Sequence, residues 1–431
     1  MATGFLLPSP TPPAALAPAG RLGHISRLPA RRKPRNETSV IIVPPSPASL
    51  DMIGKLIAFD TTSRNSNLEL IGFVRDYLGK LGVESRLVHD AEGRKANLYA
   101  TLGPMDKPGI ALSGHTDVVP IDGQEWSSDP WQVVRKDDRL YGRGTCDMKG
   151  FLGIVLAHAP EFVKRGLHTP INLAFSYDEE IGCVGVRRLL DILRDMPVRP
   201  WACIIGEPTD MKVTVGHKGK KSVRCHVRGF EAHSSLAPRA VNAVEMAAEV
   251  IVRLRAMGKR FAADGPFDPD YDVTHTTVHT GVIHGGTALN IVPKDCHFDF
   301  EFRYLPGQDA EAMFEEVRRF AEGELQPAMR AIAGDTGFSW KELSAFPGLA
   351  TPVDSKVVEL AKALSGGNAT IKVAFGTEAG LFDQAGIPTI ICGPGSITQA
   401  HKPDEWVSLD QLERCEAFMR RLMDRVCVKA A

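Results

Sequence analysis

The 431-residue sequence predicts an α/β fold in which helices cover both faces of a mainly parallel sheet and a smaller split-βαβ domain is inserted. Along most of the chain, nearly continuous apolar segments of strand length alternate with amphipathic segments of helix length. Between residues 217 and 347 the strands instead alternate apolar and polar residues, as in a sheet with one solvated face. The chain is also longer than one ordinary domain requires.

The larger, predicted catalytic domain comprises residues 51–216 and 348–431. Met52 opens its first helix, and further helices are predicted at 66–81, 149–165, 185–195, 354–365 and 408–426. Strands are predicted at 96–102, 109–113, 171–177, 201–205, 371–375 and 388–392. Strands this apolar are buried on both faces, which is typical of a parallel sheet with helical crossovers.

The inserted domain, residues 217–347, predicts the order strand–helix–strand–strand–helix–strand. Its segments are KKSVRCHVRG, NAVEMAAEVIVRLRAM, TTVHTGVIHGG, DCHFDFEFRYL, AEAMFEEVRRFAEGEL and GFSWKELS. This is the order of a split-βαβ, ferredoxin-like sandwich. An open sheet edge is a candidate dimerisation surface, so we expect the protein to form a homodimer through this domain. We also expect this domain to act as a lid.

Residues 1–50 differ from the rest of the chain. They hold 10 of the 30 prolines, and residues 1–36 contain six Arg or Lys and no acidic residue. Dense proline prevents a packed core and breaks the amphipathic helix of a transit peptide. We expect a disordered tail here.

Charge and cysteine content exclude several classes of function. The 51 Lys and Arg balance 52 Asp and Glu, which lacks the basic excess of a nucleic-acid binder. No apolar run approaches the roughly 18 residues of a membrane-spanning helix. The eight cysteines form no CxxC pair, so we expect reduced thiols in a cytoplasmic protein and no zinc held by thiolates.

Polar residues follow the predicted strands at the points where those strands end. They stand in SGHTDVVP, GRGTCDMKG, SYDEEIGC, GEPT and TQAHKPDE, and they are His115, Asp117, Asp147, Glu179, Glu180, Glu207 and His401. In an open α/β sheet, ligands bind beyond the carboxyl ends of the strands. We therefore expect these segments to converge on one crevice.

Two imidazoles and three carboxylates suit two divalent ions that share a bridging carboxylate. Nitrogen and oxygen donors without thiolate favour zinc, with cobalt or manganese able to substitute. Of the adjacent Glu179 and Glu180, one can be a ligand and the other the general base of a hydrolase. Asp117, two residues after His115, can fix the tautomer of that imidazole.

These motifs resemble the two-zinc aminoacylase and exopeptidase family, and the resemblance covers residues 52–426. HKGKKS, AHSS, IHGGTALNIVP, FGTEAGLF and CGPGSITQAHKPDEW are similar to its acetylornithine deacetylase branch rather than to its succinyl-diaminopimelate desuccinylase branch. The resemblance implies a zinc-exopeptidase-like fold. It also implies that His115 and Glu207 hold one metal and His401 and Glu180 the other, with Asp147 bridging.

Further roles follow from the same resemblance. Glu179 becomes the general base and Asp117 the support of His115. His233 is implied to reach the neighbouring subunit's site and stabilise the oxyanion. Asn290 and Arg303 are implied to grip the substrate carboxylate, since a guanidinium binds carboxylate bidentately, and the pocket-lining residues are implied to be Thr377 and Glu378.

The expected activity is that of a dizinc amidohydrolase that removes the acetyl group of N-acetylornithine in arginine biosynthesis. The alternatives are another N-acyl amino acid, such as N-succinyl-diaminopimelate, or a dipeptide. A catalytically silent binding protein is disfavoured, because it should have lost a ligand or the base. His275 and His279, on alternating strands, are interpreted as surface residues rather than metal ligands.

Overall fold

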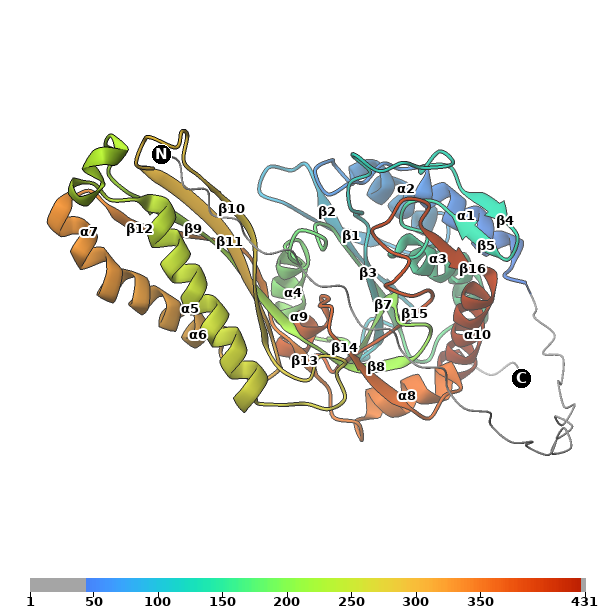
Figure 1. Ribbon diagram of the computed structural model, residues 1–431. Coiled ribbons are helices and arrows are strands. Elements are labelled where there is room, and N and C mark those ends of the chain that lie inside the picture. Colours follow the sequence, from blue (N-terminus) through green and yellow to red (C-terminus); the bar gives the residue numbers. More distant parts are fainter. Residues whose placement is uncertain (1–43, 428–431) are drawn as a thin grey trace, which may run out of the picture. The chain divides into compact units, whose positions relative to one another are not determined.

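The computed structural model describes residues 44–427 (Figure 1). Most of the predicted tail, residues 1–43, lies outside this range. Helix α1 (Pro47–Ile57) begins earlier than predicted, because the hydroxyl of Ser46 accepts a hydrogen bond from the Ser49 amide and Pro47 occupies the first turn. Residues 47–50 are therefore helical.

A nine-stranded sheet forms the centre of the larger part. Its strands are β1 (Ser85–His89), β2 (Ala96–Leu102), β3 (Ile110–His115), β6 (Ile171–Ser176), β7 (Ala202–Pro208), β8 (Val213–His217), β13 (Leu349–Ala350), β14 (Thr370–Val373) and β15 (Thr389–Gly393). The order is β1-β2-β6-β3-β7-β15-β8-β13, with β14 paired to β8. Strands β6, β3, β7 and β15 are parallel, whereas β1, β2, β8 and β13 pair with their neighbours along this order antiparallel.

Helices cover this sheet on both faces, as predicted. They are α2 (Leu68–Gly79), α3 (Lys149–Arg165), α4 (Val186–Asp195), α8 (Lys356–Ser365), α9 (Ala379–Gln384) and α10 (Leu409–Val426). Helices α1, α2, α3, α8 and α10 share one core, and α4 and α9 share the other. Strand residues alternate between the cores: Leu112 faces the first and Ala111 the second. This is why the strands read as continuously apolar.

Every strand predicted for this sheet is present, whereas β1, β8 and β13 were missed. Strand β1 carries Arg86 and His89 at a sheet edge, where polar residues are tolerated. Strand β13 has only two residues, too few for a period-2 pattern. A small sheet of β16 (Trp406–Ser408), β5 (Arg139–Tyr141) and β4 (Val134–Lys136) was also missed.

The inserted segment forms the predicted split-βαβ sandwich. Its elements are β9 (Gly219–Arg228), a 3-10 helix (Ser234–Arg239), α5 (Ala243–Asp264), β10 (Thr277–Gly285), β11 (Asp295–Tyr304), α6 (Ala310–Arg319), a π-helical turn (Phe320–Leu325), α7 (Gln326–Ile332) and β12 (Gly337–Phe346). The antiparallel order is β10-β11-β9-β12, and the helices pack on one face (Figure 1). Residues from 42 onward group as one compact unit, so the limits 51–216, 217–347 and 348–431 stay predictions.

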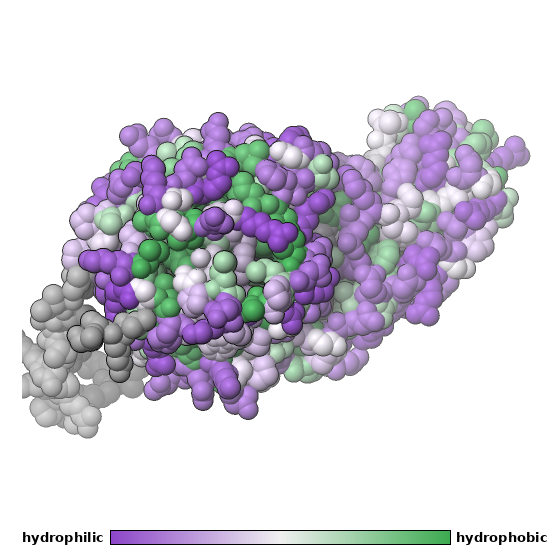
Figure 2. Space-filling model, turned by 180° about the vertical axis from the view of Figure 1, so that it is seen from behind, coloured by the Kyte–Doolittle hydropathy of each residue, from purple (hydrophilic) through white to green (hydrophobic). Residues whose placement is uncertain are grey.

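The structure shows where apolar residues and cysteines lie. No helix within residues 44–427 is long and apolar enough to cross a membrane. Figure 2 shows a mainly hydrophilic face with hydrophobic residues gathered between hydrophilic ones. All eight cysteines are buried free thiols.

We predict that the close packing of α3 on α1 depends on Gly153. A Cβ atom there would lie 2.5 Å from Ile53 Cγ1 and 3.0 Å from the Ile53 backbone nitrogen. Gly153→Ala should therefore lower the free energy of unfolding by about 1–3 kcal/mol through overpacking, although alanine favours helix by about 1 kcal/mol. Urea unfolding measures this.

The matched control is Gly72→Ala in α2, where a Cβ meets nothing within 4 Å. That variant should unfold at equal or higher urea concentration. Equal stability of Gly153→Ala and wild type would contradict the packing argument.

Candidate metal centre

The predicted ligands lie together at the carboxyl ends of the parallel strands. His115 ends β3, and Glu207 stands near the end of β7. Glu179 and Glu180 follow β6, and Asp147 stands two residues before the first residue of α3. His401 lies in the loop after β15. The parallel arrangement of β3, β6 and β7 brings these segments to one edge of the sheet.

Asp147 lies between the two imidazoles. Its Oδ1 is 3.0 Å from His115 Nε2, and its Oδ2 is 3.2 Å from His401 Nε2. His401 Nε2 is also 3.1 Å from Glu180 Oε2. On the other side, His115 Nε2 is 3.6 Å from Glu207 Oε1. One carboxylate with each oxygen aimed at a different imidazole is the arrangement that a bridging ligand requires.

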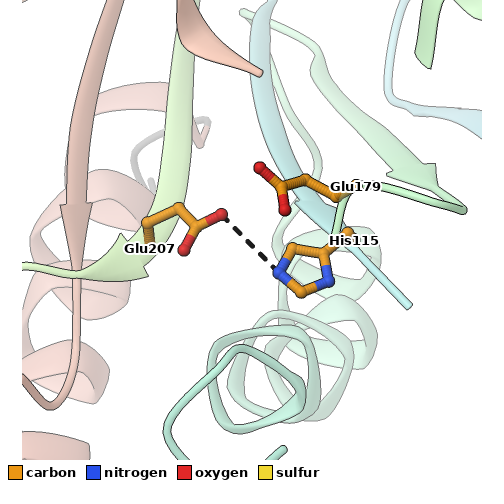
Figure 3. Close-up of side chains that lie close together, drawn as sticks. All are labelled: His115, Glu179 and Glu207. Carbon is orange, nitrogen blue, oxygen red and sulfur yellow. Dashed lines mark ion pairs between the residues drawn. The ribbon is translucent and has the colours of Figure 1, made fainter. Parts of the chain in front are cut away.

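Glu179 lies beside the His115–Glu207 pair (Figure 3). Ligand atoms of these three residues lie within 4.8 Å of one another, as do those of His115, Asp147 and Glu180. The thiol of Cys183 is 3.4 Å from Glu179 Oε1 and donates to it.

Asp117 contacts His115 and the backbone of Glu179 and Glu180 through hydrogen bonds. Its backbone carbonyl is 2.8 Å from His115 Nδ1, and its carboxylate accepts the backbone amides of Glu179 at 3.1 Å and Glu180 at 3.3 Å. Ser63 Oγ donates to the same carboxylate at 2.7 Å. A proton on Nδ1 bound to the carbonyl leaves the lone pair of Nε2 facing Asp147 and Glu207. Asp117 therefore orients both the imidazole and the Glu179–Glu180 turn.

Burial and mutual repulsion disfavour the charged forms of three glutamates in the cluster. Burial, reinforced by neighbouring carboxylates, raises the pKa of Glu179 and Glu207 well above the usual range and that of Glu180 to about 7. Hydrogen bonds to Asp147 and Glu180 raise the pKa of His401 to about 11. Burial opposes ionisation of Asp147, but hydrogen bonds from His115 and His401 lower its pKa.

The donor set thus fits divalent cations. Each buried carboxylate oxygen costs free energy unless a cation or donor faces it. Imidazole and carboxylate donors without thiolate match zinc, cobalt or manganese.

A cavity of about 260 Å³ opens onto these ligands. Beyond the cluster, its wall includes Lys220, Arg303, Phe346, Phe375 and Gly376. Arg303 Nε donates to Glu301 Oε1 at 3.0 Å.

Thr377 and Glu378 are buried next to this wall rather than on it. Within the described chain, neither carboxylate oxygen of Glu378 has a hydrogen-bond partner, and burial raises its pKa to about 7.

His233 and Asn290 lie outside the cavity of their own chain. Both are exposed, and the Ser234 amide donates to the Asn290 carbonyl at 3.0 Å. Neither of the other two histidines singled out from the sequence belongs to a candidate group of metal ligands among the described residues: His279 is exposed and His275 is half-buried.

Sequence reasoning missed three residues around the centre. Lys220 lines the cavity. Glu405 and Arg143 form a buried ion pair of 2.8 Å, each with 1% of its side chain exposed. Glu405 stands four residues after His401 in HKPDEW and Arg143 four before Asp147 in GRGTCD, so proximity to a ligand was the available signal.

Known proteins are similar to this chain over most of its length. The family description "Peptidase family M20/M25/M40" matches residues 111–425. The acetylornithine deacetylase of Myxococcus xanthus is 32% identical over an alignment of 392 residues that covers 88% of this chain and 98% of that protein. The acetylornithine deacetylase of Proteus mirabilis is 33% identical and covers 86% of this chain and 93% of its own.

Solved structures share the fold at lower identity. An M20 family metallo-carboxypeptidase from Sulfolobus solfataricus superposes with a TM-score of 0.70 at 21% identity, covering 88% of this chain and 99% of its own. A dinuclear metal-binding M20 peptidase from Bacillus subtilis gives 0.57 at 15% identity, covering 87% and 97%.

The fold and site define a metal-dependent hydrolase of amide bonds. The chain belongs to peptidase family M20/M25/M40.

Stability should depend on pH through His217, the last residue of β8. It is fully buried, and its Nε2 accepts the Gly380 amide at 3.3 Å. Burial lowers its pKa to about 4, whereas an unfolded histidine titrates near about 6.5. Below about pH 6.5 the unfolded chain binds a proton that the folded chain refuses until about pH 4, so stability is lost as pH falls through this window.

We predict that His217→Gln removes up to about 1.4 kcal/mol of pH dependence per pH unit between pH 6.5 and 4. Urea unfolding at several pH values measures it, with His89→Gln, at an exposed position on β1, as the control. Parallel pH profiles for wild type and His217→Gln would contradict this role.

Proposed function

We propose that the protein deacetylates N2-acetyl-L-ornithine to L-ornithine and acetate, as a zinc-dependent, homodimeric, cytoplasmic enzyme of arginine biosynthesis. The observation that carries the proposal is the cluster in which buried Asp147 faces buried His115 with one oxygen and the exposed His401 with the other. Relatives named acetylornithine deacetylase, similar over more than four-fifths of the chain, support the choice of substrate.

In this proposal, His115 and Glu207 hold one ion, His401 and Glu180 hold the second, and Asp147 bridges them. When bound, the two ions supply Lewis-acid polarisation of the amide carbonyl and positive charge for the carboxylates. Cobalt or manganese can substitute for zinc.

Glu179 is the proposed general base. Its carboxylate takes a proton from the attacking water and returns it to the nitrogen of the departing amine. Burial raises the pKa of its carboxyl group, so this side chain takes up a proton more readily than an exposed glutamate does. Asp117 keeps it in place through the Glu179 amide.

Arg303 is the proposed partner of the substrate carboxylate. Arg303 lines the cavity that opens on the cluster. Its guanidinium can bind a carboxylate bidentately. Lys220 lines the same cavity and adds a second cation. Asn290 is proposed for the same role and, like His233, would enter the site of a second subunit. Thr377 and Glu378 are proposed to shape the pocket from behind its wall.

His233 is the proposed oxyanion donor for the neighbouring subunit. It is exposed, as such a role requires, and large apolar side chains around it are exposed as well: Phe230 45%, Leu236 46%, Leu289 101% and Ile291 40%. Exposed apolar residues gathered in this way are typical of an association surface. They support a homodimer formed through the inserted segment.

A second candidate is an N-acyl amino acid with an apolar side chain. The cavity wall carries Phe346, Phe375 and Ile397 beside the cations Lys220 and Arg303. This lining favours a carboxylate and an uncharged side chain over the ammonium group of ornithine.

The test is the rate of amine release in zinc- or cobalt-loaded protein, compared by kcat/KM. We expect N2-acetyl-L-ornithine to exceed N-succinyl-diaminopimelate and N-acetyl-L-methionine by tenfold or more, about 1.4 kcal/mol of transition-state binding. A preference for N-acetyl-L-methionine would overturn the ornithine assignment in favour of the second candidate.

The roles of Glu179 and His233 can be tested by complementation. Glu179→Gln and His233→Ala should each bind two metal ions and lose at least about 100-fold in kcat. In a mixed dimer of the two variants, one site combines Glu179 of the His233→Ala chain with His233 of the Glu179→Gln chain. Because this site has both residues, co-expression should restore activity.

The control is a mixed dimer of Glu179→Gln with Glu179→Gln/His233→Ala, which contains no intact site. Failure of the first mixture to exceed this control, with heterodimers demonstrated, would contradict a role in trans.

A further inference from the structure

The loop before α3 is organised around one buried oxygen atom. Glu405 Oε1 accepts backbone amides from Gly144 at 3.1 Å, Cys146 at 2.9 Å and Asp147 at 3.0 Å. Three converging amide donors fix the path of the chain up to the residue that carries the carboxylate between the two imidazoles. Such donors are costly to leave unpaired in a buried loop.

The other oxygen of Glu405 pairs with Arg143. Oε2 is 2.8 Å from Arg143 Nη1, and 1% of each side chain is exposed. Arg143 Nη2 also donates to Gln124 Oε1 at 2.5 Å. Replacing such a pair by apolar residues is often neutral or stabilising, so its presence is weak support for a role in stability alone.

The same network reaches the loop of His401. Gln124 Nε2 donates to the His401 carbonyl at 3.2 Å, and Arg143 Nη1 lies 3.4 Å from the Lys402 carbonyl. His401 has a φ of 62°, in the left-handed region that a non-glycine residue adopts only when its surroundings hold it. Glu405 itself follows four residues later.

We propose that Glu405, with Arg143, is a positioning residue of the metal centre. Its carboxylate connects the two chain segments that carry Asp147 and His401, and so sets the separation of the ligands on which the second ion depends. This inference rests on the metal roles given under the proposed function. It assigns Glu405 no contact with substrate or ion.

The test is Glu405→Gln in the full-length protein, with metal binding as the readout. The amide oxygen can still accept backbone donors, but the amide nitrogen then faces the Arg143 guanidinium as a second donor. Chelator competition with zinc should show one ion bound about 10–100-fold more weakly, the range for ligand-orienting groups. The visible absorption spectrum of the cobalt-loaded protein should change as well.

The matched control is Glu416→Gln on α10. Glu416 is also buried, and its Oε1 accepts the Ser46 amide at 2.8 Å and the Ser46 hydroxyl at 2.7 Å, away from the metal centre. This variant should lower the melting temperature and leave zinc affinity and the cobalt spectrum unchanged.

Wild-type zinc affinity and an unchanged cobalt spectrum in Glu405→Gln would overturn the inference. If that variant does not fold, Arg143→Lys serves instead, because it retains the charge but loses the forked contacts to Glu405, Gln124 and Lys402; unchanged metal binding there has the same meaning. A wild-type protein that binds no zinc would instead overturn the proposed function.

Discussion

Burial of several carboxylates within reach of two imidazoles is the constraint on which the rest of this structure depends. Asp147, Glu179, Glu180 and Glu207 are drawn together although their charges repel, and burial strengthens that repulsion. The backbone that carries these residues is held by hydrogen bonds to two further carboxylates. Asp117 binds the amides of the Glu179–Glu180 turn, and Glu405, outside this set, binds the amides leading to Asp147.

The parallel centre of the sheet explains why these groups meet at all. Strands β3, β6 and β7 end at the same edge, so residues far apart in the chain project into one crevice. The antiparallel strands at both ends of the sheet take no part in holding the ligands. The α/β scaffold thereby places the candidate metal ligands, whereas the inserted segment contributes Lys220 and Arg303 to the wall of the cavity.

The wall of the cavity combines groups with opposite preferences. Arg303 and Lys220 attract a carboxylate, whereas Phe346 and Phe375 favour an apolar group beside it. Glu301 partly neutralises the two cations, lying 3.0 Å from Arg303 Nε and 3.7 Å from Lys220 Nζ. In the proposed function, a substrate carboxylate would therefore compete with Glu301 for Arg303.

Local sequence determined the alternation of strands and helices, the split-βαβ order of the insert and the set of residues at the strand ends. Apolar periodicity depends only on residues close together in the chain, so it can be recognised without knowledge of the fold. Edge strands such as β1 escaped because solvent tolerates polar residues there. Glu405 and Arg143 each stand four residues from a predicted ligand, but their pairing across more than 250 residues leaves no periodic trace in the sequence. Only the tertiary structure decided those contacts, because it alone determines which distant backbone amides and charges lose water together.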